Sequence, residues 1–144
     1  MSKTKAIISF ALIFVLILLP TAAFAKSFDN PNPNLGSIYS GTNLTINKLK
    51  VSVNQTVRVK LTLKQNSKKA PRVAAKLNIV KTVGSPITIP DLSGMTSPSG
   101  KVVWKFKIRD YDPAAVAGDT FRLTVSITDI NGDVTIGSTD VIVR

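Results

Sequence analysis

The 144-residue chain contains no cysteine, no histidine and no glutamate, so all eight of its acidic residues are aspartates. The absence of cysteine excludes disulfides, thiol nucleophiles and thiolate metal sites. The absence of histidine excludes a Ser-His-Asp triad, an imidazole zinc site and a proton shuttle that titrates near neutral pH. Catalysis would depend on aspartate, lysine, serine, threonine and tyrosine alone. We therefore expect a protein that is not an enzyme and that needs no cofactor.

The first 25 residues have the three regions of a secretory signal peptide. Lys3 and Lys5 precede an apolar run over 6–19, and the small residues Ala23 and Ala25 occupy the positions that a signal peptidase reads. The apolar run is shorter than the roughly 20 residues that a membrane-spanning helix needs. We expect cleavage after Ala25, a secreted or cell-surface product, and no stable membrane span in that product.

Cleavage would leave 119 residues, with 17 cations against eight acids and a net charge of +9. This length suits one domain with a hydrophobic core. Residues 26–37 are rich in asparagine and proline and predict a stiff, irregular leader, because proline restricts its own backbone and that of its predecessor. Residues 38–144 are expected to form the domain, whose core must suffice without disulfides.

Alternating apolar and polar residues predict about seven short strands. The clearest are 57–63 and 102–108, where every second residue is apolar. Others are expected at 49–53, 73–79, 87–89, 121–127 and 134–143, with a polar turn at 65–71 and an Asn-Gly hairpin turn at 129–133. Strands of this length and spacing predict an all-β fold, a two-sheet antiparallel sandwich. Trp104 shares its phase with Phe106 and Ile108, so we expect it in the core.

Three short motifs resemble bacterial immunoglobulin-like domains of the invasin and intimin type. They are 53–61 (VNQTVRVKL), 96–104 (TSPSGKVVW) and 117–125 (AGDTFRLTV), the last with Phe121 where tyrosine is usual. The resemblance implies an immunoglobulin-like sandwich and a role in adhesion at the cell surface. The segment 110–119 is longer than the usual turn of the family, and a lone domain differs from the family's usual tandem arrays.

Six cations lie on outward-facing positions of two predicted strands: Arg58, Lys60 and Lys64 on one, and Lys105, Lys107 and Arg109 on the other. In immunoglobulin topology these are strands B and E, which are neighbours, so all six would share one face. Because like charges opposite each other in a sheet repel, we expect them to bind an anionic partner, such as an acidic cell-envelope polymer, a polysaccharide or lipid head groups. The alternative is a solvated face whose lysines prevent edge-to-edge aggregation.

Other candidate sites have simpler explanations. The aromatic residues fall on core-facing positions rather than among the cations, so we do not expect nucleic acid to bind. Asp110, Asp112 and Asp119 lie in one loop, whereas Asp129 and Asp133 lie in a hairpin at the far end of the intervening strand. We assign these aspartates to turn chemistry and expect no metal site. The glycosylation sequons at Asn43 and Asn54 occur no more often than chance predicts.

Three functional interpretations remain. The first is a secreted or surface-associated binding or structural module that acts without catalysis. The second is a filament subunit, in which the leader and first strand of one copy add to the sheet of the next. The third, a small exported hydrolase or inhibitor, is disfavoured by the residue inventory.

Overall fold

The computed structural model describes residues 26–27, 43–129 and 132–144. The predicted signal peptide and almost all of the predicted leader lie outside this part of the chain. The described segments form strands and one short 3₁₀ helix, η2 (Ile108–Asp110). A search of these segments finds no helix that is long and apolar enough to cross a membrane.

The strands form two main sheets and one small hairpin. The first sheet has the order β1 (Lys26–Ser27), β2 (Asn43–Ile46), β4 (Thr56–Thr62), β9 (Lys101–Lys107), and all of its neighbours are antiparallel. The second has the order β3 (Lys50–Val51), β11 (Gly132–Val143), β10 (Thr120–Asp129), β7 (Ala74–Val83), β8 (Leu92–Met95). In this sheet only β3 and β11 pair in parallel. A separate hairpin joins β5 (Lys64–Gln65) to β6 (Lys68–Lys69).

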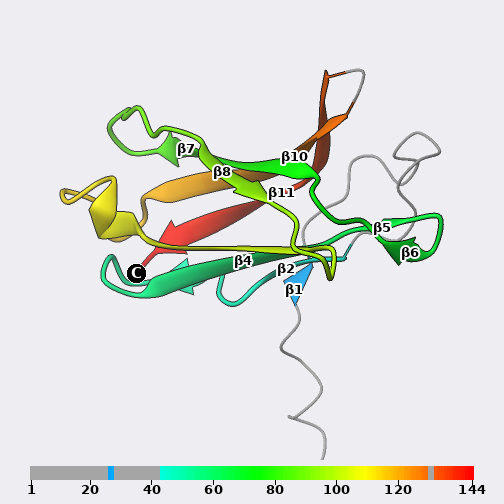
Figure 1. The fold of residues 1–144 in the computed structure, drawn as a ribbon. Helices are drawn as coiled ribbons and strands as arrows, with labels where there is room; N and C mark the ends of the chain where they lie inside the picture. The colour runs from blue at the N-terminus through cyan, green and yellow to red at the C-terminus, as the bar shows by residue number, and fades with distance from the viewer. Residues whose placement is uncertain (1–25, 28–42, 130–131) are drawn as a thin grey trace, which may run out of the picture.

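The two main sheets lie over each other as two layers (Figure 1). Alternate side chains of each sheet fill the space between them, because successive residues of a strand point to opposite faces. From the first sheet Val57, Val59 and Leu61 are fully buried, and from the second Leu77 and Phe121 are fully buried. The predicted all-β fold is therefore confirmed, and its layers have the arrangement of a β-sandwich.

Several local predictions are also confirmed. The strand pair β4 and β9 covers most of the two clearest alternating runs. The strands β10 and β11 pair antiparallel on either side of the predicted hairpin turn, of which residues 130 and 131 lie outside the described part. Trp104 is only 5% exposed, as expected of a core residue.

The predicted strand at 87–89 is wrong, and the edge strand of the second sheet is β8 instead. Pro86 and Pro90 flank the predicted strand and lack the N–H groups that a ladder needs. Ile89 is buried all the same, so its apolar character reflects packing rather than pairing. Gly94 lets β8 approach the first sheet closely, since a Cβ atom at this position would lie 2.7 Å from Cγ2 of Val102.

Three further parts of the fold differ from the sequence prediction. The predicted polar turn at 65–71 overlaps the hairpin of β5 and β6, which starts at Lys64 and is exposed on all four of its strand residues. The predicted strand at 49–53 shortens to the two residues of β3. The strand β2 was not predicted, although its Leu44 and Ile46 are buried.

Candidate functional site

Five cations share the outer face of the first sheet. Arg58 and Lys60 come from β4, and Lys101, Lys105 and Lys107 come from β9. All five side chains are exposed, while the residues between them in sequence point into the core. We call these five residues the basic face.

The register of β4 against β9 brings these charges close together. Arg58 lies directly opposite Lys105, and Lys60 lies opposite Val103 between two lysines of β9. Opposite residues in an antiparallel pair are about 4.5–5.5 Å apart at Cα, and residues two apart along a strand are about 7 Å apart. These spacings are shorter than the Debye length of about 8 Å at physiological salt, so the cations repel one another.

Two of the six predicted cations lie elsewhere. Lys64 belongs to β5 of the small hairpin, where it pairs with Lys69. Arg109 lies in η2, because the chain leaves the sheet after Lys107, and its guanidinium donates a hydrogen bond of 3.2 Å to the side chain of Asn54. The prediction omitted Lys101, which begins β9 on the same outward phase. The structure thus brings together four predicted cations and adds a fifth.

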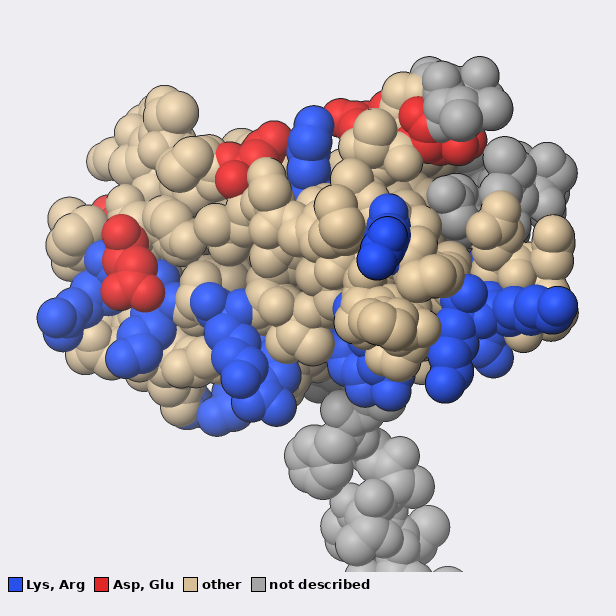
Figure 2. All heavy atoms as spheres, in the orientation of Figure 1, with Lys and Arg blue, Asp and Glu red and all other residues tan. Residues whose placement is uncertain are grey.

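Positive and negative charges are segregated between the two layers. Within residues 43–129 and 132–144, no ion pair involves the basic face; those that form are Lys76–Asp133, Lys81–Asp112, Lys81–Asp119 and Arg122–Asp140. Figure 2 shows the same division, with lysine and arginine along the layer of β4 and most of the aspartate at the layer of β7 and β10. The five cations of the basic face therefore form no ion pair with a described carboxylate.

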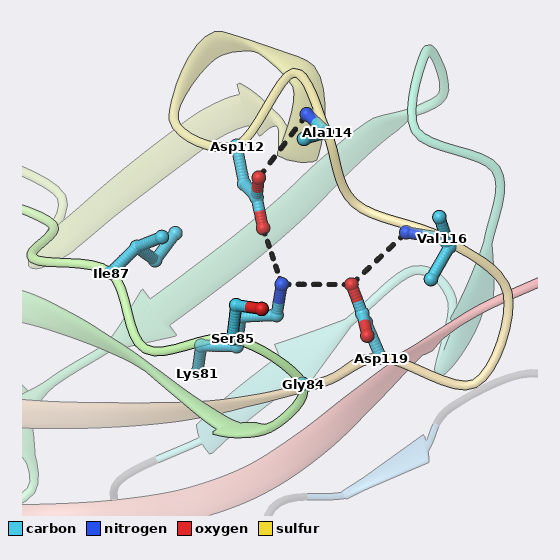
Figure 3. Close-up of a pocket in the computed structure, with 8 residues that line it drawn as sticks. All are labelled: Lys81, Gly84, Ser85, Ile87, Asp112, Ala114, Val116 and Asp119. Atoms are coloured by element: carbon cyan, nitrogen blue, oxygen red, sulfur yellow. Dashed lines mark hydrogen bonds and ion pairs between the residues drawn. The ribbon is translucent and has the colours of Figure 1, made fainter.

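A second cluster of charged groups lies at the end of the second sheet. Lys81 extends from β7, and its amine lies 2.6 Å from Oδ2 of Asp112 and 2.8 Å from Oδ2 of Asp119 (Figure 3). The side chains of these three residues are 4%, 6% and 7% exposed, respectively. They line one wall of an open pocket of about 440 Å³, together with Ile87 and Val116. We call these three residues the lysine cluster.

Backbone contacts hold both carboxylates of the lysine cluster in place. Asp112 accepts a hydrogen bond from the backbone N–H of Ala114 at 3.2 Å, and Asp119 accepts one from Val116 at 3.0 Å. Hydrogen bonds from Lys81 and Val116 lower the pKa of Asp119. In return, hydrogen bonds to Asp112 and Asp119 raise the pKa of Lys81. The cluster consequently rests as an ammonium between two carboxylates.

The sequence analysis missed the lysine cluster, although the sequence contains a signal for it. Lys81 continues the buried phase of Ala75, Leu77 and Ile79 along β7. Asp119 continues the buried phase of β10 in the same way, two residues before Phe121. When two paired strands carry opposite charges at inward-facing positions near their ends, a buried ion pair is expected there.

The remaining aspartates serve local structure. Asp133 accepts hydrogen bonds from Thr128 and Lys76, at the other end of β10 from Asp112 and Asp119. The two aspartate groups do not converge, as the sequence analysis expected. Over the residues that the structure describes, no group of three acidic side chains could hold a metal ion. The sequon residues Asn43 and Asn54 are both exposed.

Comparison with known proteins identifies no family. No protein-family profile matches the chain. No curated protein sequence matches it either. Among solved structures, the soluble domain of PmoD from a Methylocystis species aligns with a TM-score of 0.44 at 11% identity, over 77% of this chain and 99% of that one. Similarity at this level does not establish a shared fold or function.

Proposed function

We propose that the protein is an exported immunoglobulin-like domain that binds anionic cell-envelope polymers or polysaccharides through its basic face, without catalysis. The observation that carries this proposal is the cluster of five exposed cations on one sheet, with no ion pair to any described carboxylate. A sheet that places Arg58 opposite Lys105 loses stability to repulsion. A bound polyanion relieves this repulsion and releases its own counterions.

The strand order supports the immunoglobulin-like part of the proposal. If β2, β4 and β9 are strands A, B and E, and β7, β10 and β11 are strands C, F and G, the two sheets match the ABE and GFC layers of such domains. In this assignment β8 extends the GFC sheet beyond strand C. The hydrophobic run and small residues at 6–25 support export.

The form of the basic face favours an extended partner over a small ligand. The five cations lie on the outer surface of a sheet, and none of them lines the pocket beside Lys81, Asp112 and Asp119. Cations two or four residues apart along a strand, at about 7 or 14 Å, suit a polymer with repeated phosphate, carboxylate or sulfate groups. Binding of this kind is governed by charge and falls steeply with salt.

The proposal predicts that charge position, not total charge, determines binding. The variant R58Q/K105Q/K107Q removes three charges from the basic face. The matched control K64Q/K68Q/K69Q removes three charges, which are also exposed, from the hairpin of β5 and β6. On dextran sulfate and polyphosphate columns, we expect the first variant to elute at clearly lower salt than wild type and the control to elute close to wild type. Equal elution of the two variants would contradict a localised site.

A second candidate function is assembly by strand addition. The leader contributes β1 to the edge of the first sheet, where Lys26 and Ser27 pair with Ile46 and Thr45. A strand from a neighbouring copy would occupy this same edge. If the protein assembles in this way, deletion of residues 26–42 should abolish concentration-dependent multimers in sedimentation experiments. A monomeric full-length product at high concentration would exclude it.

A further inference from the structure

The lysine cluster is unusual for a domain of this size, because three ionisable side chains are removed from water together. Its single ammonium faces two carboxylates, so the buried group carries net negative charge in a strongly basic protein. Taking charges out of water is costly, and apolar residues in their place often give a more stable protein. Such a cluster therefore calls for a role beyond stability.

The geometry of the cluster brings a nucleophile and an acyl carbon together. The 2.6 Å contact between Nζ of Lys81 and Oδ2 of Asp112 places the amine beside the carboxyl carbon of the same group. The hydrogen bond from Ala114 fixes the orientation of that carboxyl group. Groups held this way in near-attack positions react as if at effective concentrations of about 10⁵ M or more.

Burial opposes the hydrogen bonds that hold Lys81 and Asp119 in their charged forms. Nζ of Lys81 lies 5.6 Å from the centre of the Phe121 ring, and Ile87 and Val116 line the same pocket. Burial against apolar walls weakens the hydration that normally stabilises an ammonium and a carboxylate. Only proton transfer within the cluster is needed to give a free amine beside a neutral carboxyl group.

We propose that Lys81 and Asp112 condense into an intramolecular amide bond, with Asp119 as the proton carrier. The ammonium first gives one proton to Asp112, and the Nζ lone pair then attacks Cγ of that neutral carboxyl group. Asp119 takes a second proton from nitrogen and passes it to the departing hydroxyl, so the C–O bond breaks and one water leaves. Asp119 begins and ends as a carboxylate, and the step needs no oxidant, reductant or co-reactant.

The positions of the two aspartates assign these roles. Oδ2 of Asp119 accepts hydrogen bonds from both Lys81 and the backbone of Val116, which stabilises its ionised form. An ionised carboxylate beside the amine is suited to accept a proton. Asp112, whose carboxyl group lies 2.6 Å from the same amine, is left as the acyl partner. Because its neighbours raise the pKa of Lys81, the free amine is scarce and the bond forms slowly after folding.

The amide would connect the two layers of the fold. Lys81 belongs to β7 of the second sheet, whereas Asp112 lies just after η2, which follows β9 of the first sheet. Exported domains commonly use disulfides for such links, but this chain has no cysteine. A covalent bond that closes a loop restricts the unfolded chain as a disulfide does. Formation of this amide does not depend on the basic face or on its partner.

Mass spectrometry of the purified, aged protein tests the bond directly. We expect an intact mass lower by one water than that of the processed sequence. Trypsin should then fail to cleave after Lys81 and release a branched peptide in which 77–101 is joined to 110–122. The bond is refuted if the folded protein, after days at neutral pH, has the full mass and is cleaved normally after Lys81.

Three variants separate the chemistry from the fold. Lys81→Arg keeps the positive charge but cannot form the amide, so its mass deficit should be absent. Asp119→Asn should fold, as judged by the fluorescence of Trp104, and form the bond at least tenfold more slowly. Lys76→Arg changes a residue of β7, the strand of Lys81, that forms an exposed ion pair with Asp133 of β11, and it should leave the deficit unchanged. A mass deficit that persists in Lys81→Arg would overturn the assignment.

Discussion

Gly84 shows how one residue shapes the lysine cluster. Its φ of +108° is a conformation that L-residues rarely adopt, and a Cβ atom here would collide with Oδ1 of Asp119 and lie 2.5 Å from Cε of Lys81. Glycine is therefore required for two reasons, backbone conformation and space. The chain turns tightly beside the cluster because no side chain occupies this position.

Substitution of Gly84 by alanine should destabilise the fold more than the same change at Gly118. Both glycines have positive φ, so both variants suffer backbone strain of about 1–3 kcal/mol. A Cβ atom at Gly118 would meet nothing within 4 Å, so only Gly84→Ala must also displace the cluster. Urea unfolding followed by Trp104 fluorescence measures both free energies. An equal loss of unfolding free energy in the two variants would show that Lys81 and Asp119 can move away from the added Cβ atom without cost.

Among the elements, the paired strands β4 and β9 carry the cations that are proposed to bind a polyanion, and repulsion between these cations destabilises the sheet. Arg58 and Lys105 lie directly opposite each other on the outer face. Lys105→Glu would replace repulsion by attraction and stabilise the sheet by a few tenths of a kcal/mol. Lys105→Gln would remove the repulsion alone. We expect unfolding free energies at low salt to rise from wild type to the glutamine and then the glutamate variant, while retention on polyanion columns falls in the same order. Wild type as the most stable of the three would contradict this interpretation.

The paired strands β10 and β11 carry an ion pair of opposite charges, whose contribution to stability should depend on pH. Arg122 contacts both oxygens of Asp140, at 2.8 and 3.0 Å, and this hydrogen-bonded pair lowers the pKa of Asp140. A carboxyl group with a lowered pKa in the folded state stabilises the fold above its unfolded pKa of about 3.9, and the effect is lost as pH falls through the folded value. Wild type should therefore melt slightly above Asp140→Asn at neutral pH, and the two melting temperatures should converge below about pH 4. A difference that is constant down to pH 2 would exclude the ion pair as its cause.

At the scale of the whole molecule, the predictable part of the fold is the part governed by alternation. The strands β4 and β9 are buried on one face and exposed to solvent on the other. Their alternation of apolar and polar residues therefore identifies both the strands and the outward-facing cations. β8 could not be predicted, because its burial pattern is weak and its position depends on the close approach that Gly94 permits. The lysine cluster depends on residues 38 apart in sequence, Lys81 and Asp119, which only the pairing of β7 and β10 brings together.

The cations of the second sheet, such as Lys76 and Arg122, are paired with aspartates, whereas those of the basic face are not. The charge of the described part of the molecule is therefore uneven across its layers (Figure 2), and this unevenness would act as an electric dipole with the basic face at the positive end. In the field of an anionic surface such a dipole experiences a torque before any contact is made. The domain would therefore arrive with its first sheet already turned toward the surface. Orientation during diffusion, rather than tight contact alone, would then determine how fast it is captured, and this advantage would fade as added salt shortens the range of the field.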